Sequence, residues 1–105
     1  MKVGDSIGGL YKKTLPDGKD VWTLSEGKIT KIVQNSRGTK VHSKRFYPID
    51  IEEIEDNTKM MQEAEGWILT REFVLLTPEI REKCDRWIKW ANENPGKAVG
   101  LISGA

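Results

Sequence analysis

Hydrophobic and polar positions along the first fifty residues alternate as they do in short β-strands separated by turns. Ile7, Gly9 and Tyr11 fall on one face of the first run, because alternate residues of a strand point the same way. Residues 15–19, Leu-Pro-Asp-Gly-Lys, then favour a turn, since proline presets φ and glycine accepts a positive φ. The β-branched and aromatic residues at 21–24 predict the next strand.

The run after this strand predicts that it continues with a bend. Residues 28–34 place Ile29 and Val33 on one face of a regular strand and Ile32 on the other. Gly27 stands just before them, and a glycine inside a strand is typical of a bulge or a sharp bend. We therefore expect one long bent strand.

A hairpin is predicted to follow. Asn-Ser-Arg-Gly at residues 35–38 favours the loop, and residues 39–47 have the composition of the return strand. Pro48 ends that strand, because proline has no N–H to donate to a neighbour. Consecutive, short, bent antiparallel strands are typical of a small barrel.

The pattern changes after residue 50 and favours helices. Residues 50–56 form an acidic segment with room for one helical turn. Asn57 is expected to cap a helix over residues 58–65, and Gly66 to end it. Residues 67–76 predict one buried strand.

The clearest local signal is a helix start at Thr77-Pro78-Glu79. A threonine cap, a proline at the first helical position and a glutamate in the first turn all favour it. Apolar residues then recur at helical spacing and form one stripe: Ile80, Cys84, Trp87, Ile88 and Ala91. Because Asn94-Pro95-Gly96 stops the pattern, the predicted helix covers residues 78–94.

These elements predict a single α+β domain over residues 1–96. A bent antiparallel barrel is expected from residues 1–50 and 67–76, capped by the C-terminal helix. Residues 97–105 are mostly small and apolar and predict a flexible tail. A chain of 105 residues is long enough for one modest hydrophobic core without cross-links or metal.

Charge is divided unequally between the two halves. Residues 1–50 carry ten Lys/Arg and five Asp/Glu, a net of +5, whereas residues 51–105 carry seven and eleven, a net of −4. The formal total is only +1. Such polarity suits a protein that works by binding, although the small total argues against indiscriminate binding to nucleic acid.

Cysteine content and hydropathy indicate the compartment. Cys84 is the only cysteine, so no internal disulfide can form and a reducing interior is favoured. No stretch approaches the roughly 20 apolar residues that a membrane helix needs, and no apolar signal region follows Lys2. We expect a cytoplasmic protein, in a bacterial host, without a membrane partner.

No set of residues in the sequence forms a recognisable catalytic, metal or cofactor site. The only histidine, His42, lies in a predicted basic strand and has no local motif linking it to Cys84 or Ser43. One histidine and one cysteine cannot supply the four ligands of a structural zinc site. The glycines near the start do not form a phosphate-binding loop. We expect a protein that is not an enzyme and holds no cofactor.

Two charged surfaces remain as candidate binding sites. The basic one lies in the predicted hairpin, beside Phe46 and Tyr47, and offers cations for phosphate together with aromatic rings for stacking. The acidic one can compete for the DNA-binding cations of a nuclease. Exposure to solvent alone also accounts for either surface. The basic candidates are Lys28, Lys31, Arg37, Lys40, Lys44 and Arg45, and the acidic candidates are Glu52, Glu53, Glu55 and Asp56.

One tryptophan is a candidate for contact with another protein. Trp90 lies three residues beyond Trp87, about 80° off the centre of the helical stripe at 100° per residue. This position is the edge of the face that the helix buries. Trp90 is therefore a candidate anchor for a partner protein or for self-association.

Two short motifs resemble those of a known family. Residues 3–5, Val-Gly-Asp, and residues 26–32, Glu-Gly-Lys-Ile-Thr-Lys-Ile, are similar to the opening of small SH3-like barrel proteins of Firmicutes and their phages. Residues 74–79 before the basic–acidic helix resemble their closing strand. The resemblance covers about two thirds of the chain and implies an SH3-like barrel without catalytic residues. The insert at 50–66 and the longer helix depart from it.

A subset of such small mobile-element proteins consists of type II-A anti-CRISPR inhibitors. The resemblance therefore implies, as a first hypothesis, a non-enzymatic inhibitor that binds an RNA-guided type II nuclease and obstructs its engagement of DNA. The acidic residues would contact the nuclease. The alternative is an SH3-like module that binds DNA or RNA through the basic residues, and a third possibility is an adaptor that docks through Trp90.

Overall fold

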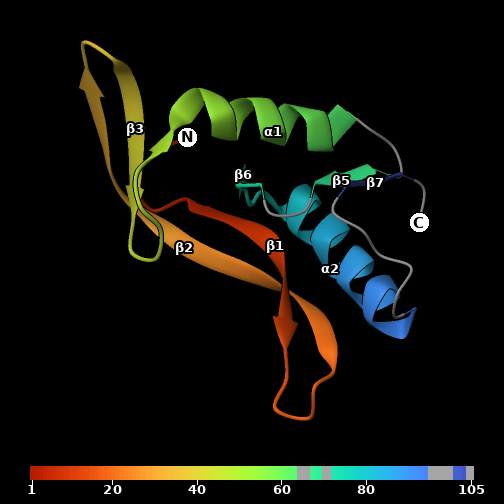
Figure 1. The fold of residues 1–105 in the computed structure, drawn as a ribbon. Helices are drawn as coiled ribbons and strands as arrows, with labels where there is room; N and C mark the ends of the chain where they lie inside the picture. Colours follow the sequence, from red (N-terminus) through yellow and green to blue (C-terminus); the bar gives the residue numbers. More distant parts are fainter. Residues whose placement is uncertain (64–66, 70–71, 95–100, 104–105) are drawn as a thin grey trace.

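The computed structural model describes residues 1–63, 67–69, 72–94 and 101–103. Seven strands and two helices follow one another in these residues (Figure 1). Their bounds are β1 (Ser6–Thr14), β2 (Asp20–Asn35), β3 (Gly38–Ser43), β4 (Ile49–Asp50), α1 (Ile51–Glu63), β5 (Trp67–Leu69), β6 (Val74–Leu75), α2 (Pro78–Glu93) and β7 (Leu101–Ser103).

Five of the strands form one antiparallel sheet in the order β4-β3-β2-β1-β6. The 16-residue β2 connects its two halves, because β1 pairs with residues 20–28 of β2 and β3 with residues 29–35. The β1–β2 and β2–β3 hairpins project from opposite ends of β2 (Figure 1). The result is a small α+β protein with a curled antiparallel half-barrel and two helices.

Two hydrophobic clusters hold the helices to this sheet. In the first, Leu10 and Trp22 of the sheet pack with the buried face of α2. In the second, Ile7, Ile29, Val41 and Ile49 pack with Ile54 of α1. Met61, near the end of α1, belongs to the first cluster. The helix α1 therefore contacts both clusters and connects them.

The helix α2 begins as its sequence predicts. The Thr77 hydroxyl oxygen accepts a hydrogen bond from the Ile80 N–H at 3.2 Å, and Pro78 is the first helical residue. Trp87 meets Trp22 edge to face, with ring centroids 4.9 Å apart. The Asn92 side-chain amide accepts a hydrogen bond from the backbone N–H of Trp22 at 2.7 Å and donates one to the backbone carbonyl of Trp22 at 3.1 Å. These contacts tie α2 to β2.

The helix α1 differs from its prediction, because it begins at Ile51 and takes in all of the acidic segment except Asp50, which belongs to β4. Ile54, Thr58 and Met61 are its buried residues, at spacings of four and three, so a helical face is buried from the first turn. Asn57 lies inside the helix, where its side-chain amide donates to the Phe73 carbonyl at 3.2 Å. The prediction of Asn57 as a cap was wrong.

Two strand predictions also differ from the structure. The return strand β3 ends at Ser43, and its hydroxyl accepts a hydrogen bond from the Phe46 N–H at 3.2 Å, which turns the chain before Pro48. The single strand predicted over residues 67–76 is two short strands in different sheets, β5 with β7 and β6 with β1.

The end of the chain adds one strand to the predicted arrangement. Within the predicted tail at 97–105, residues 101–103 form β7 and pair with β5. Residues 97–100 and 104–105 lie outside the described residues, as do 64–66 at the predicted end of the shorter helix. Among the parts of the chain that the structure describes, neither helix has the length and apolar character to cross a membrane.

Candidate functional site

A bulge in β2 sets which residues of the β2–β3 hairpin share a face. The pairing shifts between Ile29, which is opposite Ser43, and Lys31, which is opposite His42. The extra residue lets Ile29 and Ile32, three positions apart, both pack on the second cluster. A regular strand would separate them, so the prediction that Ile32 faces away from Ile29 was wrong.

The same bulge brings lysines together on the opposite face. The Lys44 N–H donates to the Lys28 carbonyl at 3.3 Å, which continues the pairing by one step and sets these two residues opposite each other. Directly opposed residues of an antiparallel pair lie on one face. This face also carries Val33 and Asp50. We name its five basic residues together the basic ribbon face: Lys28, Lys31, Lys40, His42 and Lys44.

The basic ribbon face is only partly neutralised. The Lys40 ammonium lies 2.8 Å from the Asp50 carboxylate, its cross-strand neighbour. Lys28, Lys31 and Lys44 have no carboxylate within ion-pair distance among the described residues. Like charges directly opposed across a ladder are destabilising. Fold stability therefore does not explain why three unneutralised lysines gather here.

The acidic residue nearest to this face in sequence is already engaged. Both carboxylate oxygens of Glu26 accept hydrogen bonds from the Arg81 guanidinium, at 2.9 and 2.7 Å. These bonds, with smaller contributions from Ser6 and Lys28, lower the pKa of Glu26 from 4.5 to about 2. Glu26 is thus ionised at neutral pH, and its carboxylate is held by Arg81 of α2.

The two predicted arginines lie elsewhere. Arg37, in the hairpin loop, lines a cavity of about 330 Å³ with Asp50 and the first turns of α1. Arg45 lines another hollow, beside Phe46 and Tyr47. Of the six basic candidates, the structure therefore brings Lys28, Lys31, Lys40 and Lys44 together on one face, and it places Arg37 and Arg45 at separate positions.

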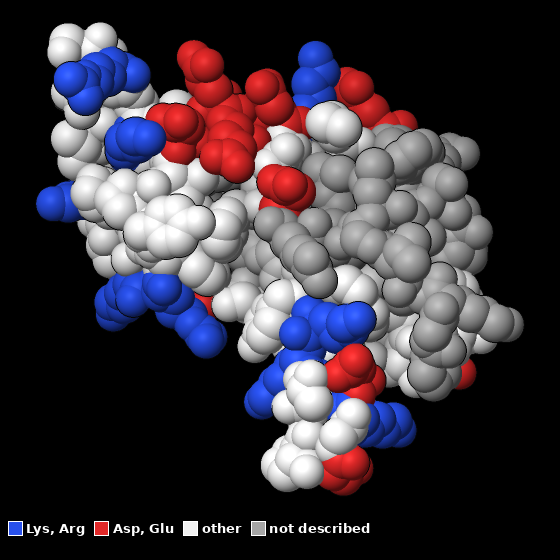
Figure 2. All heavy atoms as spheres, viewed as in Figure 1, with Lys and Arg blue, Asp and Glu red and all other residues white. Residues whose placement is uncertain are grey.

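The acidic candidates all lie on α1, and each is exposed. Glu52 and Glu53 occupy the first turn, with Glu55 and Asp56 just after it. Carboxylates there are stabilised by the positive end of the helix dipole and by unpaired N–H groups. Figure 2 shows acidic side chains along α1 and Lys/Arg side chains over the neighbouring hairpin. The acidic face thus has a structural role that the basic ribbon face lacks.

An aromatic groove lies on the other face of the sheet, that of Ile7 and Gly27, next to the loop that follows β3. Its hollow of about 500 Å³ is lined by Tyr11, Arg45, Phe46, Tyr47 and Phe73, with Gly9, Leu10 and Ser25. Phe46 and Phe73 pack with centroids 4.6 Å apart, whereas Tyr47 is 77% exposed and Tyr11 38% exposed. Sequence reasoning named Phe46 and Tyr47 but missed Tyr11 and Phe73. The signal for Tyr11 was its alternation with Ile7 and Gly9.

Gly27 explains how the loop that carries this groove packs so closely. A side chain added at Gly27 would come within 3.3 Å of both Arg45 Cβ and Phe46 Cε2. Gly27 is buried inside β2 and its pairing with Ile7 is regular. The bulge predicted at this glycine lies two to three residues later, and the glycine instead makes room for residues 45–46.

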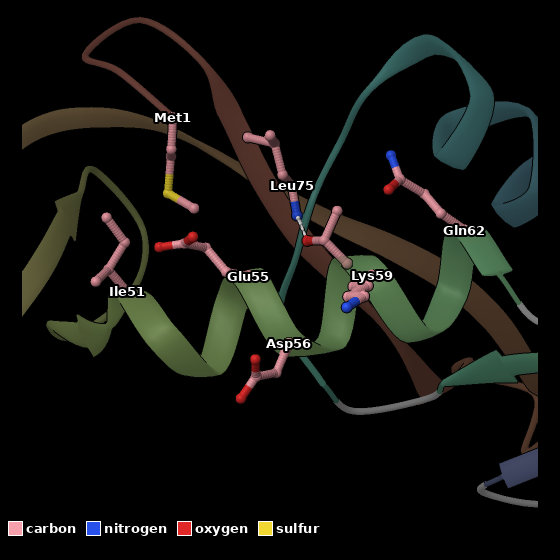
Figure 3. A pocket seen from close by; sticks show the side chains of 8 residues that line it. Met1, Ile51, Glu55, Asp56, Lys59, Gln62 and Leu75 are labelled. Atoms are coloured by element: carbon pink, nitrogen blue, oxygen red, sulfur yellow. Dashed lines mark hydrogen bonds between the residues drawn. The ribbon is translucent and has the colours of Figure 1, made fainter.

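A third hollow of about 510 Å³ follows the flank of α1 (Figure 3). Met1 extends over one end, toward Ile51 and Glu55, while Lys59 and Gln62 lie toward the other end. On its wall the Thr58 hydroxyl donates to the Ile54 carbonyl at 2.6 Å and accepts from the Leu75 N–H at 2.8 Å. Thr58, a buried polar residue in the wall, thus has its hydroxyl hydrogen-bonded within the protein.

The remaining candidates lie in three different environments. Cys84 is 1% exposed within the first cluster, and burial raises the pKa of its thiol to about 11, so it is held as an unreactive thiol. His42 lies on the basic ribbon face. Trp90 is half-buried and packs against the first cluster. Across the described residues, no group of three His, Cys, Asp or Glu is placed to hold a metal ion.

Comparisons of the chain with protein-family models, with curated proteins and with solved structures find no match. The geometry of these surfaces is therefore the basis for the function proposed below.

Proposed function

We propose that this protein binds nucleic acid through the basic ribbon face, with phosphate groups as the ligands. The observation that carries the proposal is the gathering of Lys28, Lys31 and Lys44 on one face without a described carboxylate partner. Their mutual repulsion destabilises the free protein, and a row of phosphates would relieve it. A nucleic-acid backbone is a polymer that offers such a row.

The dimensions of the face suit a phosphate backbone. From Lys28 to the pair formed by Val33 and Lys40 the strand spans roughly 16 Å, which is about the rise of five base pairs. Contacts with phosphates position a protein without reading bases, so we expect binding that is independent of sequence and sensitive to salt.

The first prediction concerns this salt dependence. With three to four lysines on phosphates, the logarithm of the duplex-binding constant should fall against the logarithm of salt concentration with a slope of about −3 to −4. Lys31→Ala and Lys44→Ala should each weaken binding and make the slope shallower by about one. Fluorescence anisotropy of a labelled duplex, titrated at several salt concentrations, measures both quantities.

The matched control is Lys13→Ala in the other hairpin. Lys13 is exposed and has no ion pair with a described residue, so its replacement removes the same charge from a different surface. We expect it to leave the slope unchanged. Equal losses for Lys13→Ala and Lys31→Ala would mean that net charge alone drives binding, and the proposal would then be wrong.

The exposed carboxylates of α1 support a second candidate function. Glu52, Glu53, Glu55 and Asp56 form no ion pair with a described cation, so they are free to meet the arginines of a partner. This surface would serve an inhibitor of a type II CRISPR nuclease. In a cleavage assay, a half-inhibitory dose that follows nuclease concentration supports inhibition of the enzyme, and one that follows DNA concentration supports the basic ribbon face.

Both candidates are binding functions, and neither assigns a reaction to this chain. We also propose that the half-barrel is a variant of the SH3-like barrel. The support is the arrangement of its strands, in which β1 to β4 pair in succession and β6 returns to β1. A lone reduced cysteine agrees with a cytoplasmic location, where nucleic acid is accessible.

A further inference from the structure

The aromatic groove after β3 has features that phosphate binding on the basic ribbon face does not use. Phe46 and Phe73 pack on each other, while Tyr47 projects with 77% of its surface exposed and Tyr11 with 38%. The ribbon lysines need no aromatic neighbour to hold a phosphate. Two partly free rings over a hollow of about 500 Å³ are instead suited to stacking a flat group.

Charge at the groove indicates what the flat group carries. Arg45 lines the hollow and has no ion pair with a described carboxylate. Lys44, the preceding residue, lies on the basic ribbon face. No acidic residue is among the described residues that line the hollow, although the backbone of Glu72 lies against Gly9. The groove therefore offers a cation to an anionic ligand, on the face of the sheet opposite to the basic ribbon face.

From these observations we infer that the aromatic groove takes an unpaired nucleobase of a single strand, with Arg45 holding the adjoining phosphate. This inference rests on the proposed function and specifies its substrate class. A base within a duplex is already stacked on its neighbours, so only a single-stranded or flipped base can offer its face to Tyr47. Stacking accepts any base, which keeps the binding independent of sequence.

The test compares three labelled ligands of about twelve units by anisotropy: single-stranded DNA, the matching duplex and an abasic strand that keeps its phosphates. Tyr47→Ala should weaken binding of the single strand roughly five- to a hundredfold. It should leave duplex affinity and the salt slope within error of the wild type. Tyr47→Phe should retain single-strand affinity within about threefold, since the ring remains. The abasic strand should bind the wild type and Tyr47→Ala equally.

Two controls distinguish a binding effect of the groove from one of the basic ribbon face and from a loss of stability. Because Tyr47 is mostly exposed, its variants should keep the wild-type thermal midpoint. Lys31→Ala should weaken the single strand and the duplex alike, unlike Tyr47→Ala. If Tyr47→Ala leaves single-strand binding unchanged while Lys31→Ala weakens it, the inference about the groove is wrong and the proposed function stands.

Two further results would overturn the inference. If the wild type binds none of the three ligands at low salt, the proposed function fails and the inference fails with it. If a proline-rich peptide binds with dependence on Tyr47, and single-stranded DNA does not compete with it, the groove is a peptide site.

Discussion

The basic ribbon face and the acidic face of α1 are neighbours, and each gathers side chains of a single charge. The local structure stabilises the charges on the acidic face and destabilises those on the basic ribbon face. Glu52 and Glu53 lie in the first turn of α1, where the helix dipole stabilises carboxylates. Lys28 and Lys44 oppose each other across a ladder, where like charges repel. A charge cluster is thus better evidence of binding when the fold gives it no stabilising role.

The largest effect on stability is expected at Ile54, which packs beneath both faces. Ile54 is 0% exposed and packs α1 against Ile29 and Val41, beneath the ribbon. Ile54→Ala should lower the free energy of unfolding by about 2–5 kcal/mol, because it leaves a cavity as well as losing buried area. Urea unfolding monitored by circular dichroism measures the change.

The control for Ile54 is Met60→Ala on the same helix. Met60 is 55% exposed, so its truncation should change stability by no more than about 0.5 kcal/mol. Equal effects at the two positions would show that α1 is not anchored through Ile54, and the two faces would then not share a support.

A smaller effect is expected from acid titration of the Glu26–Arg81 pair. The pKa of Glu26 is lowered from 4.5 to about 2 in the folded protein, first by its hydrogen bonds to Arg81. A lowered carboxyl pKa contributes stability that is present above about pH 4.5 and is lost as the pH falls toward about 2. Glu26→Gln should therefore flatten the stability curve between these values.

The measurement is the urea midpoint as a function of pH for both proteins. The pair is more than one third exposed, so its contribution is that of a well-formed surface ion pair, at most about 1 kcal/mol. Parallel curves for the wild type and Glu26→Gln would contradict the pairing. Arg81→Gln removes the other partner of the pair and should flatten the curve in the same way.

The smallest effects on stability are expected from removing one charge on each face, and the two changes should have opposite signs. Lys44→Gln removes a charge opposed by Lys28 and should raise stability by about 0.2–1 kcal/mol. Glu53→Gln removes a carboxylate from the first turn of α1 and should lower stability by about 0.3–1 kcal/mol. Urea unfolding at low ionic strength measures both. Both differences should shrink in about 1 M salt, and changes of the same sign would break the comparison.

Local signals in the sequence predicted part of this fold. Thr77-Pro78-Glu79 located the start of α2, and the stripe from Ile80 to Ala91 located its buried face. The turn at 15–19 and the loop at 35–38 were likewise predicted between the strands that the structure shows. Each of these features depends on residues within a few positions of one another, which a sequence displays directly.

The remaining features depend on contacts between distant residues. The start of α1 at Ile51 is decided by burial of Ile54 against the sheet, which outweighs the turn-like composition of the acidic segment. The bulge lies after Ile29 because Ile32 must reach the same cluster. The aromatic groove joins Tyr11, Tyr47 and Phe73 from three separate segments. Alternation along a single strand could not show any of these contacts.

The most direct test of the central claim is to map the surface that meets nucleic acid. Amide chemical shifts would be followed by NMR while a short single-stranded or duplex DNA is added at low salt. The account predicts the largest shifts at residues 28–31 and 40–44, with the acidic face of α1 at 52–56 unaffected. Shifts concentrated at 52–56, or no shifts at any described residue, would contradict it.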